Sequence, residues 1–512
     1  MRLPALLAIF ALGTFPADAQ RAGAVPPACT PEPGTVDELP ALDAGRRPLA
    51  VLDFESSSGE QAQHDLAAAL GKRVSARLAS VRPREVITRP SRGGGGVAAL
   101  NGPSGAEVRY LLEGRLEPGT TVATLTIRLL DGRTGSEVWS GRFGRGRQRL
   151  FELEGAISAA IASRTLRNLS REEMQQLTQP PTRDPDAYQK FLTAVGLLEE
   201  PGRPALERAI VELDAAWRED PTFVDAWLGL ALAYGRFLAR DGLSAAHRAA
   251  ILNAALEATD KALTLDAGRS DAWVARAILL EIRSPRELSG VRSAYERAIA
   301  IDPDDPEAHR RLGRLLTQLG EFERAARHLR SSLFLEPERA QALIDLAELR
   351  LAQGDFSAAC VVLNAALEAD PGSSDAYVLR VLARIPLREY RAAWTDAETA
   401  VRLGSPAQGE AVAVLVDVAA EETNAALARA RRLEERPLIR SARSLSVREG
   451  QIFSFAFVAV GDHAAALRSL NRVSPRGAGL WRVMQDERLA SLRGNPGFQT
   501  LLAAASPFEG QP

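Results

Sequence analysis

A spacing of 34 residues organises the middle of this chain. Asp302-Pro303, Glu336-Pro337 and Asp370-Pro371 follow one another at that interval, and Gly320-Glu321-Phe322 returns as Gly354-Asp355-Phe356. Proline cannot continue a helix, and it pushes the residue before it out of the helical region. Each acidic-proline step is therefore predicted to end a helix and to begin a turn. A repeat of this length predicts an array of helix pairs.

Small residues recur at fixed positions of the same unit. Ala347 stands 34 residues after Gly313, and Ala359 stands 34 residues after Ala325. Small residues let the two helices of a pair approach closely, while larger neighbours fill the gaps. This combination resembles the tetratricopeptide repeat (TPR) family, which implies an all-α superhelical solenoid that binds protein or peptide partners. One repeat cannot bury its apolar face alone, so stacking must stabilise the array.

The repeats are predicted to cover residues 186–405, with two regular units at 306–339 and 340–373. A proline-containing linker is expected at 171–185. Residues 406–512 are interpreted as degenerate helical repeats and a C-terminal cap, because the end units of such arrays are atypical.

Residues 1–19 have the features of a secretory signal peptide. Arg2 provides the positive charge, an apolar run follows, and Ala17-Asp18-Ala19 is a small-x-small cleavage pattern before Gln20. An uncleaved anchor is the alternative. We expect cleavage, a disordered leader at 20–47, no membrane-spanning segment in the mature chain, and a bacterial periplasmic or secreted location.

The composition excludes some classes of partner and site. A net charge of -2 gives no reason to expect nucleic acid as a partner. The two cysteines, Cys29 and Cys360, form no disulfide framework. Cys29 lacks the aliphatic residue of a lipidation box because Pro26 stands in its place. Cys360 is predicted to be a small buried hydrophobe, and nothing in the sequence favours a disulfide between the two.

Residues 48–170 have a different character and predict a compact α/β domain. Strands are expected at 48–54, 85–88, 108–117, 121–130 and 137–143, and helices at 64–80 and 150–169. The run Gly93 to Gly96 is predicted to be a surface loop, because no lysine-serine or lysine-threonine pair follows it as in a phosphate-binding loop.

Four motifs of this domain carry a resemblance to a known family. They are Leu49 to Phe54, Arg109 to Gly114, Ile127 to Asp131 with Thr134 to Ser140, and Leu150 to Glu154. In this order they resemble the TolB-like N-terminal domain, which stands before TPR arrays in bacterial regulators. The resemblance implies an α/β module, and the run from Trp481 to Leu502 resembles the end of the same proteins.

No pattern in the chain indicates catalysis. The five histidines, which include His309 and His328, lack metal-ligand spacing, and His309 is interpreted as a packing residue. No nucleophile elbow, Walker loop or dinucleotide fingerprint is present in the sequence. We therefore expect a non-enzymatic protein without a metal or cofactor.

Binding residues are assigned through the TPR resemblance, which places positions 2, 5, 9 and 12 of each repeat on the concave face. Arg310 and Arg314 share one helical face and are predicted to hold an acidic segment of a protein partner. The alternative is that both are solvated helix surface. The candidate residues are Glu307, Arg310, Arg311, Arg314, Thr317, Gln341, Ile344 and Glu348.

The leading hypothesis is thus an exported TPR scaffold that binds protein partners, within a cell-envelope complex. An alternative hypothesis is a sensory or regulatory module whose N-terminal domain binds a small ligand.

Overall fold

The computed structural model describes residues 49–506, apart from 59, 82–85, 90–107, 119–121, 147–150, 167, 199, 201, 239–242, 244, 284–287, 337–338, 441–443 and 474–477. The predicted signal peptide, the leader, Cys29 and the Gly93 to Gly96 loop lie outside the described residues. Within them the chain forms two compact units, one from 49–279 with 297–305 and one from 280–296 with 306–506.

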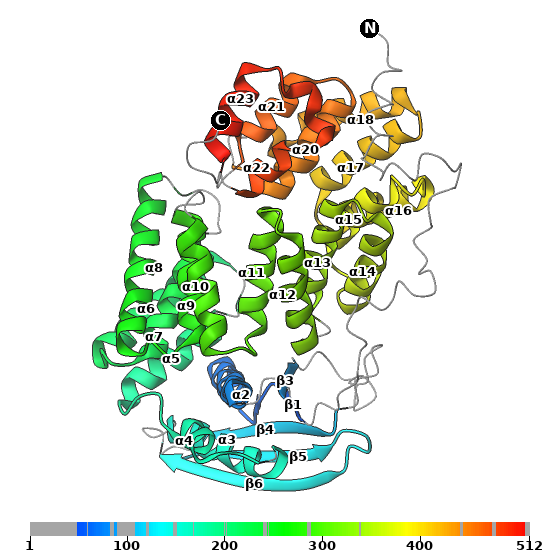
Figure 1. Ribbon diagram of the computed structural model, residues 1–512. Helices are drawn as coiled ribbons and strands as arrows, with labels where there is room; N and C mark the ends of the chain where they lie inside the picture. The colour runs from blue at the N-terminus through cyan, green and yellow to red at the C-terminus, as the bar shows by residue number, and fades with distance from the viewer. Residues whose placement is uncertain are drawn as a thin grey trace. The chain divides into compact units, whose positions relative to one another are not determined.

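The first unit begins with a mixed six-stranded sheet of order β3-β1-β4-β5-β6, in which β2 pairs with β4 (Figure 1). β1 is parallel to both β3 and β4, whereas β4, β5 and β6 form an antiparallel meander. A mixed sheet of this kind is consistent with the α/β domain predicted for this region. The strands are β1 (Leu49–Leu52), β2 (Glu55–Ser56), β3 (Val86–Arg89), β4 (Tyr110–Pro118), β5 (Val122–Asp131) and β6 (Glu137–Gly146).

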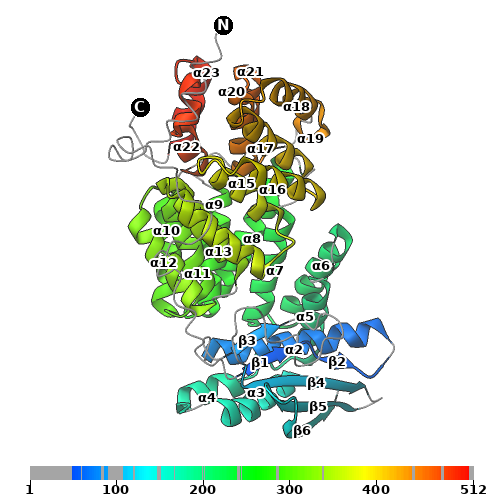
Figure 2. The same cartoon turned by 90° about the vertical axis from the view of Figure 1, so that its right-hand side faces the viewer.

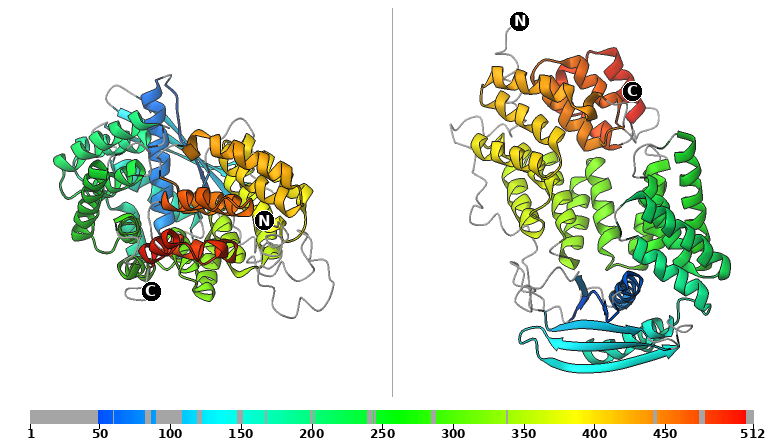
Figure 3. Two further views of the ribbon diagram at one scale, coloured as in Figure 1. Left: turned by 90° about the horizontal axis from the view of Figure 1, so that it is seen from above. Right: turned by 180° about the vertical axis from the view of Figure 1, so that it is seen from behind.

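Two helices, α2 (Gln61–Val81) and α3 (Phe151–Thr165), cover one face of this sheet (Figure 3). Alternation along the strands turns residues such as Leu112 and Leu129, which pair across β4 and β5, towards these helices. The core continues into the first repeat helices, because Tyr188 and Phe223 belong to the same cluster of buried side chains. The α/β part and the first repeats therefore share one hydrophobic core.

The remainder of the first unit is helical. Residues 171–185, expected to form a linker, contain α4 (Arg171–Thr178), whose capping box at Ser170 and Glu173 fixes its start. The helices that follow are α5 (Pro185–Leu197), α6 (Arg203–Glu219), α7 (Val224–Leu238), α8 (Ala245–Leu265) and α9 (Ser270–Arg283).

The second unit is an array of antiparallel helix pairs (Figure 2). The first helices of successive pairs, α11, α13, α15 and α17, pack against one another, and we call them the inner layer. The helices are α10 (Leu288–Ile301), α11 (Pro306–Gln318), α12 (Phe322–Leu335), α13 (Ala340–Gln353), α14 (Phe356–Ala369), α15 (Ser374–Arg384), α16 (Tyr390–Arg402), α17 (Pro406–Ala419), α18 (Thr423–Glu435), α19 (Pro437–Arg440), α20 (Val447–Ala459), α21 (His463–Asn471), α22 (Ala478–Met484), the 3-10 helix η5 (Glu487–Leu492) and α23 (Pro496–Ala505).

The helix ends fall where the 34-residue pattern predicts them. α10, α12 and α14 each end two residues before a proline, at Pro303, Pro337 and Pro371. The turn between the helices of a pair uses left-handed glycine, with φ of 78° at both Gly320 and Gly354. The repeating sequence thus sets both turns of each unit.

The close approach within the α11–α12 pair depends on Gly313. A Cβ atom at this position would lie 2.7 Å from Cγ of Leu329 and 3.3 Å from the carbonyl oxygen of Ala325. Overpacking of this kind costs about 1–3 kcal/mol, partly offset by the higher helix propensity of alanine.

Gly313→Ala is therefore expected to lower the free energy of unfolding by about 1–2 kcal/mol, measured by urea denaturation. Gly235→Ala is the matched control, since Gly235 lies inside helix α7 and no atom lies within 4 Å of its added Cβ. Equal effects of the two substitutions would contradict the close-packing explanation.

The C-terminal helices are as buried as the repeats. Phe453, Phe455 and Phe457 of α20 are all buried, and α20 packs against α17, α22 and η5. No helix within the described residues is long and apolar enough to cross a membrane.

Cys360 of α14 is fully buried among small and apolar side chains, as predicted. The structure also gives this residue a disulfide bond, which the sequence analysis did not favour.

Candidate partner-binding face

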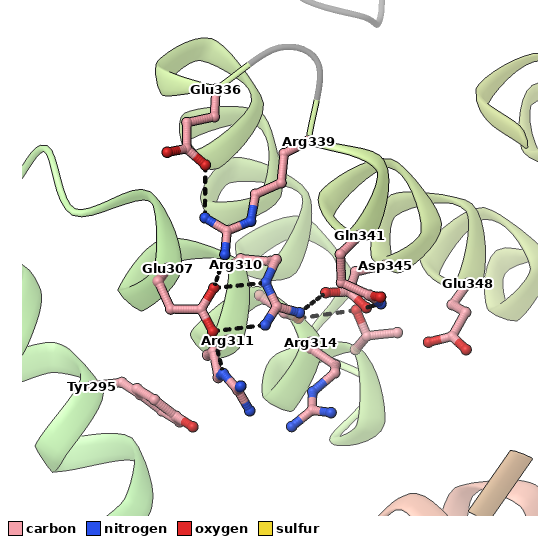
Figure 4. A network of polar contacts seen from close by, with 12 residues as sticks. Tyr295, Glu307, Arg310, Arg311, Arg314, Glu336, Arg339, Gln341, Asp345 and Glu348 are labelled. Carbon is pink, nitrogen blue, oxygen red and sulfur yellow. Dashed lines mark hydrogen bonds and ion pairs between the residues drawn. The ribbon is translucent and has the colours of Figure 1, made fainter. Parts of the chain in front are cut away.

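The predicted binding residues lie on α11 and α13, two neighbouring helices of the inner layer, and Glu307 is at the centre of their contacts (Figure 4). Its carboxylate accepts from Arg310 at 2.8 Å, from Arg311 at 2.6 Å and from Arg339 at 2.5 Å. Burial alone would raise the pKa of Glu307, but the three guanidinium groups lower it to about 2. Glu307 is therefore ionised and multiply paired.

Arg310 is a buried structural residue and not solvated helix surface. Only 5% of it is exposed, and its guanidinium donates to Asp345 of α13 at 2.6 Å as well as to Glu307. Asp345 also accepts from Gln341 at 3.3 Å. This arginine joins α11 to α13, so it cannot contact a partner without breaking buried ion pairs.

Two other predicted contact residues are also inaccessible. Thr317 donates its hydroxyl to the carbonyl of Gly313 within α11, and Ile344 is part of the core. Both face the packed interior of the array. The family pattern predicts which positions lie on the inner helices, but it does not predict which of their side chains are buried and which are exposed to solvent.

Arg311 and Arg314 are partly accessible cations of this face. Their side chains are 23% and 32% exposed. Arg314 pairs with Glu281 at 2.9 Å, and Glu281 also accepts the hydroxyl proton of Tyr295 at 2.9 Å. Figure 4 shows both guanidinium groups extending to the same side of α11, away from Arg339.

The far end of the face is covered by the chain itself. Arg448 of α20 binds Glu348 of α13, with 3.0 Å between Nε and the carboxylate, and also binds Asp375 of α15. Arg482 of α22 lies over the ring of Phe322, with 5.0 Å between Cζ and the ring centroid. Glu348, predicted to contact a partner, therefore already holds an arginine of the same chain.

The first unit contains a second buried ionic cluster, which the sequence analysis missed. Glu154 of α3 is completely buried and accepts from Arg77 at 2.8 Å and from the hydroxyl of Tyr188 at 2.6 Å. Arg73 of α2 pairs with Glu154 and with Asp225 of α7. These contacts connect the α/β helices α2 and α3 to the first repeat helices.

Asp225 of α7 is the carboxylate of this cluster that belongs to the first repeat helices. It also accepts from Arg269 at 2.7 Å. Burial would raise the pKa of Asp225, but Arg73 and Arg269 hold it well below its usual range. Asp225, Glu307 and Asp375 occupy the same position of their repeats, and each binds an arginine from another helix or turn. The recurrence of an acidic residue at this position of the repeat is the sequence feature from which the clusters could have been predicted.

His309 and His328 face each other across α11 and α12, with 3.0 Å between their Nδ1 atoms. Burial and the nearby His309, Arg324 and Arg327 lower the pKa of His328 to about 4. The structure thus places His309 in a packed helix pair. No group of three or more metal-ligating side chains occurs among the described residues.

The depressed pKa of His328 predicts acid sensitivity. The unfolded chain binds this proton near pH 6.5, whereas the folded chain binds it only near pH 4. The contribution of neutral His328 to the free energy of unfolding is therefore complete above about pH 6.5. It is lost as the pH drops towards 4, and it amounts to on the order of 1–3 kcal/mol.

We expect the urea midpoint of the wild type to fall over this range more steeply than that of His328→Asn. An asparagine side chain keeps a polar partner for His309 but has no proton to gain. Parallel pH profiles of the two proteins would contradict the prediction.

Comparison with known proteins supports the helical array. A family model described as tetratricopeptide repeat matches residues 287–334 and 320–385. This part of the chain thus consists of TPR repeats, and the prediction made from the 34-residue spacing is confirmed there. TPR repeats mediate protein–protein interactions.

Two curated proteins are similar to parts of the chain. A putative adenylate cyclase 3 of Rhizobium meliloti is 26% identical over 164 residues, which are 30% of this chain and 27% of that protein. A CTR9 homolog of Arabidopsis thaliana is 40% identical over 73 residues, 14% of this chain and 7% of that protein. The chain therefore matches only a minor part of either relative.

Two solved structures are also similar. A TPR protein from Parabacteroides merdae is 17% identical, with a TM-score of 0.37 over 49% of this chain and 93% of that chain. PilF of Pseudomonas aeruginosa is 19% identical, with a TM-score of 0.36 over 42% of this chain and 92% of that chain.

Proposed function

We propose that this protein is an exported, non-catalytic scaffold that binds a protein or peptide partner through the face formed by α11 and α13. The TPR repeats of this region support binding of this class. A cell-envelope complex is the setting that fits an exported scaffold.

The observation that carries the proposal is the pair Arg311 and Arg314. Both side chains are partly exposed, extend to the same side of α11, and belong to a helix fixed by the buried Arg310 (Figure 4). Guanidinium groups bind carboxylates in charge-assisted hydrogen bonds. An acidic segment of a partner fits this pair, and it would compete with Glu307 and Glu281 for the two arginines.

Site-specific crosslinking tests this face directly. A photoreactive phenylalanine analogue in place of Arg311 is expected to capture a protein from an envelope extract. The same analogue in place of Arg327, an exposed residue of the second helix α12 in the same repeat, is the matched control. Mass spectrometry identifies the captured protein.

Charge removal tests the chemistry of the contact. Arg311→Gln with Arg314→Gln is expected to lose the captured partner in a pull-down, whereas Arg327→Gln keeps it. Circular dichroism confirms that each variant is folded. A partner retained by the double variant, or captured equally from position 327, would move the binding surface away from α11.

Export is proposed from the signal-peptide pattern of residues 1–19. N-terminal sequencing of the purified protein is expected to begin near Gln20. Recovery of an uncleaved chain in the cytoplasmic fraction would contradict export.

The TolB-like assignment is proposed for the first α/β part. The four motifs that carry the resemblance fall on or beside β1, β4, β5, β6 and α3, all of which pack in one sheet-and-helix layer. This supports the motifs as parts of a single module.

A further inference from the structure

Glu281 of α9 divides its carboxylate between two donors. One oxygen accepts from Arg314 of α11 and the other accepts from the hydroxyl of Tyr295 in α10, both at 2.9 Å. Burial and the charge of Glu281 raise the pKa of Tyr295 well above its ordinary value, so this hydroxyl keeps its proton and donates it. Water also reaches Glu281, whose side chain is 22% exposed. Glu281 therefore stays hydrogen-bonded when Arg314 turns away from it.

Arg311 is bound in a similar way, because its carboxylate partner also has other donors. Glu307 also accepts from Arg310 and Arg339. Within the part of the chain that the structure describes, Arg311 donates through Nε alone and Arg314 donates through Nη2 alone. A guanidinium group has five N–H donors. Both arginines therefore retain donors for the carboxylates of a partner.

Arg310 on the same helix does not have this freedom. Its departure would leave Asp345, which is 2% exposed, with only the long hydrogen bond from Gln341 at 3.3 Å. Breaking a buried ion pair from one side is strongly destabilising. Among these three arginines, Arg310 is thus fixed by its contacts, whereas Arg311 and Arg314 can exchange theirs.

We propose that Glu281 is a specificity-determining residue of the α11 face: it competes with an acidic partner for Arg314, while Tyr295 holds it in place. This inference rests on the proposed function, because it concerns the same arginines. Charges of like sign repel over a few ångströms, so the carboxylate of Glu281 lowers the affinity of the face for acidic groups. Binding through Arg314 is therefore an exchange of one carboxylate for another.

The spacing of the two exchangeable arginines indicates which segments overcome this competition. Arg311 and Arg314 are three residues apart on α11, which places their Cβ atoms about 5–6 Å from each other. Acidic side chains at alternate positions of an extended segment lie about 6–7 Å apart. A segment of this kind engages both arginines at once, whereas a single carboxylate gains one contact and still meets the charge of Glu281.

The test uses the full chain and a blocked ten-residue peptide of alternating glutamate and glycine, with a glutamine–glycine peptide as the uncharged reference. Isothermal titration at low ionic strength, where exposed charges are least screened, is expected to show that the wild type prefers the glutamate peptide. Glu281→Gln removes the competing charge but keeps an acceptor for Tyr295. This substitution is expected to tighten binding of the glutamate peptide by about five- to tenfold.

Glu296→Gln in α10 is the matched control. It removes the same charge, but Glu296 pairs with Arg324 of the second helix α12, at 3.2 Å, and not with α11. The affinity for the glutamate peptide is expected to change by less than about twofold, since charges further from the peptide are screened.

Tyr295→Phe is expected to have the opposite effect to Glu281→Gln. The variant keeps the buried ring but deprives Glu281 of the hydroxyl donor, so Glu281 holds Arg314 more strongly. Binding of the glutamate peptide is expected to weaken by at least about threefold. A purely structural role would make both substitutions act in the same direction. Circular dichroism and urea denaturation show whether each variant is folded.

Two sets of outcomes separate this inference from the proposed function. If Arg311→Gln with Arg314→Gln abolishes the preference for the glutamate peptide, the α11 face binds acidic segments. The role of Glu281 is then overturned by equal effects of Glu281→Gln and Glu296→Gln, or by weaker binding in both Glu281→Gln and Tyr295→Phe. If the wild type shows no preference, or the double variant retains it, both the proposed function and the role of Glu281 are overturned.

Discussion

Glu154→Ala is expected to lower the free energy of unfolding by about 3–5 kcal/mol, because it leaves buried cations without their counter-charge. Glu154 is fully buried and binds Arg73, Arg77 and Tyr188. Its removal also deprives the Tyr188 hydroxyl of its acceptor. The loss is expected in the first unit, where all these residues lie.

Urea denaturation followed by circular dichroism measures the size of this effect, and hydrogen–deuterium exchange locates it. Tyr188→Phe removes one hydrogen bond to a charged group and is expected to cost about 1.5–3 kcal/mol. Glu172→Ala, at an exposed carboxylate of α4, should change stability by less than about 0.5 kcal/mol. If Glu154→Ala behaved like Glu172→Ala, the cluster would not hold the unit together.

Arg310→Ala is the second substitution with a large expected effect. It leaves Asp345, 2% exposed, without its 2.6 Å ion pair, and removes one partner of Glu307. Breaking a buried pair from one side costs about 3–5 kcal/mol. The urea midpoint of the second unit is therefore expected to fall sharply.

The matched control is Arg311→Ala on the same helix. Arg311 pairs with Glu307 but is partly exposed, so its loss is expected to cost about 0–1 kcal/mol. Replacing both Arg310 and Asp345 by leucine should recover much of the stability lost by Arg310→Ala, because no unpaired buried charge remains. If the double variant did not recover stability, the loss of the ion pair would not be the cause of the destabilisation by Arg310→Ala.

The repeated part of the fold could be predicted from sequence because its determinants are local. Proline at fixed spacing ends helices α10, α12 and α14, and glycine at Gly320 and Gly354 adopts left-handed backbone at the turns. Alternating apolar residues likewise indicated the strands that form β4, β5 and β6. These signals act over a few residues.

The candidate site was predicted less well, because its determinants are distant in the chain. Arg448 binds Glu348, which lies 100 positions away in the sequence, and Arg73 binds Asp225, which lies 152 positions away. No spacing rule connects such pairs. The family pattern placed Arg310 on a binding face, whereas its partners Glu307 and Asp345 make it part of the interior.

The contacts of Arg77 have a consequence for how such proteins can be recombined. Its guanidinium donates to the carbonyls of Gln176, Leu177 and Gln179, at 3.2, 3.2 and 2.5 Å, in the segment that joins the sheet to the first repeat. A chimaera spliced at Pro180 would inherit half of a charge cluster and half of a core. A viable exchange of modules, in the laboratory or in evolution, therefore requires that the sheet and the first repeats be transferred together.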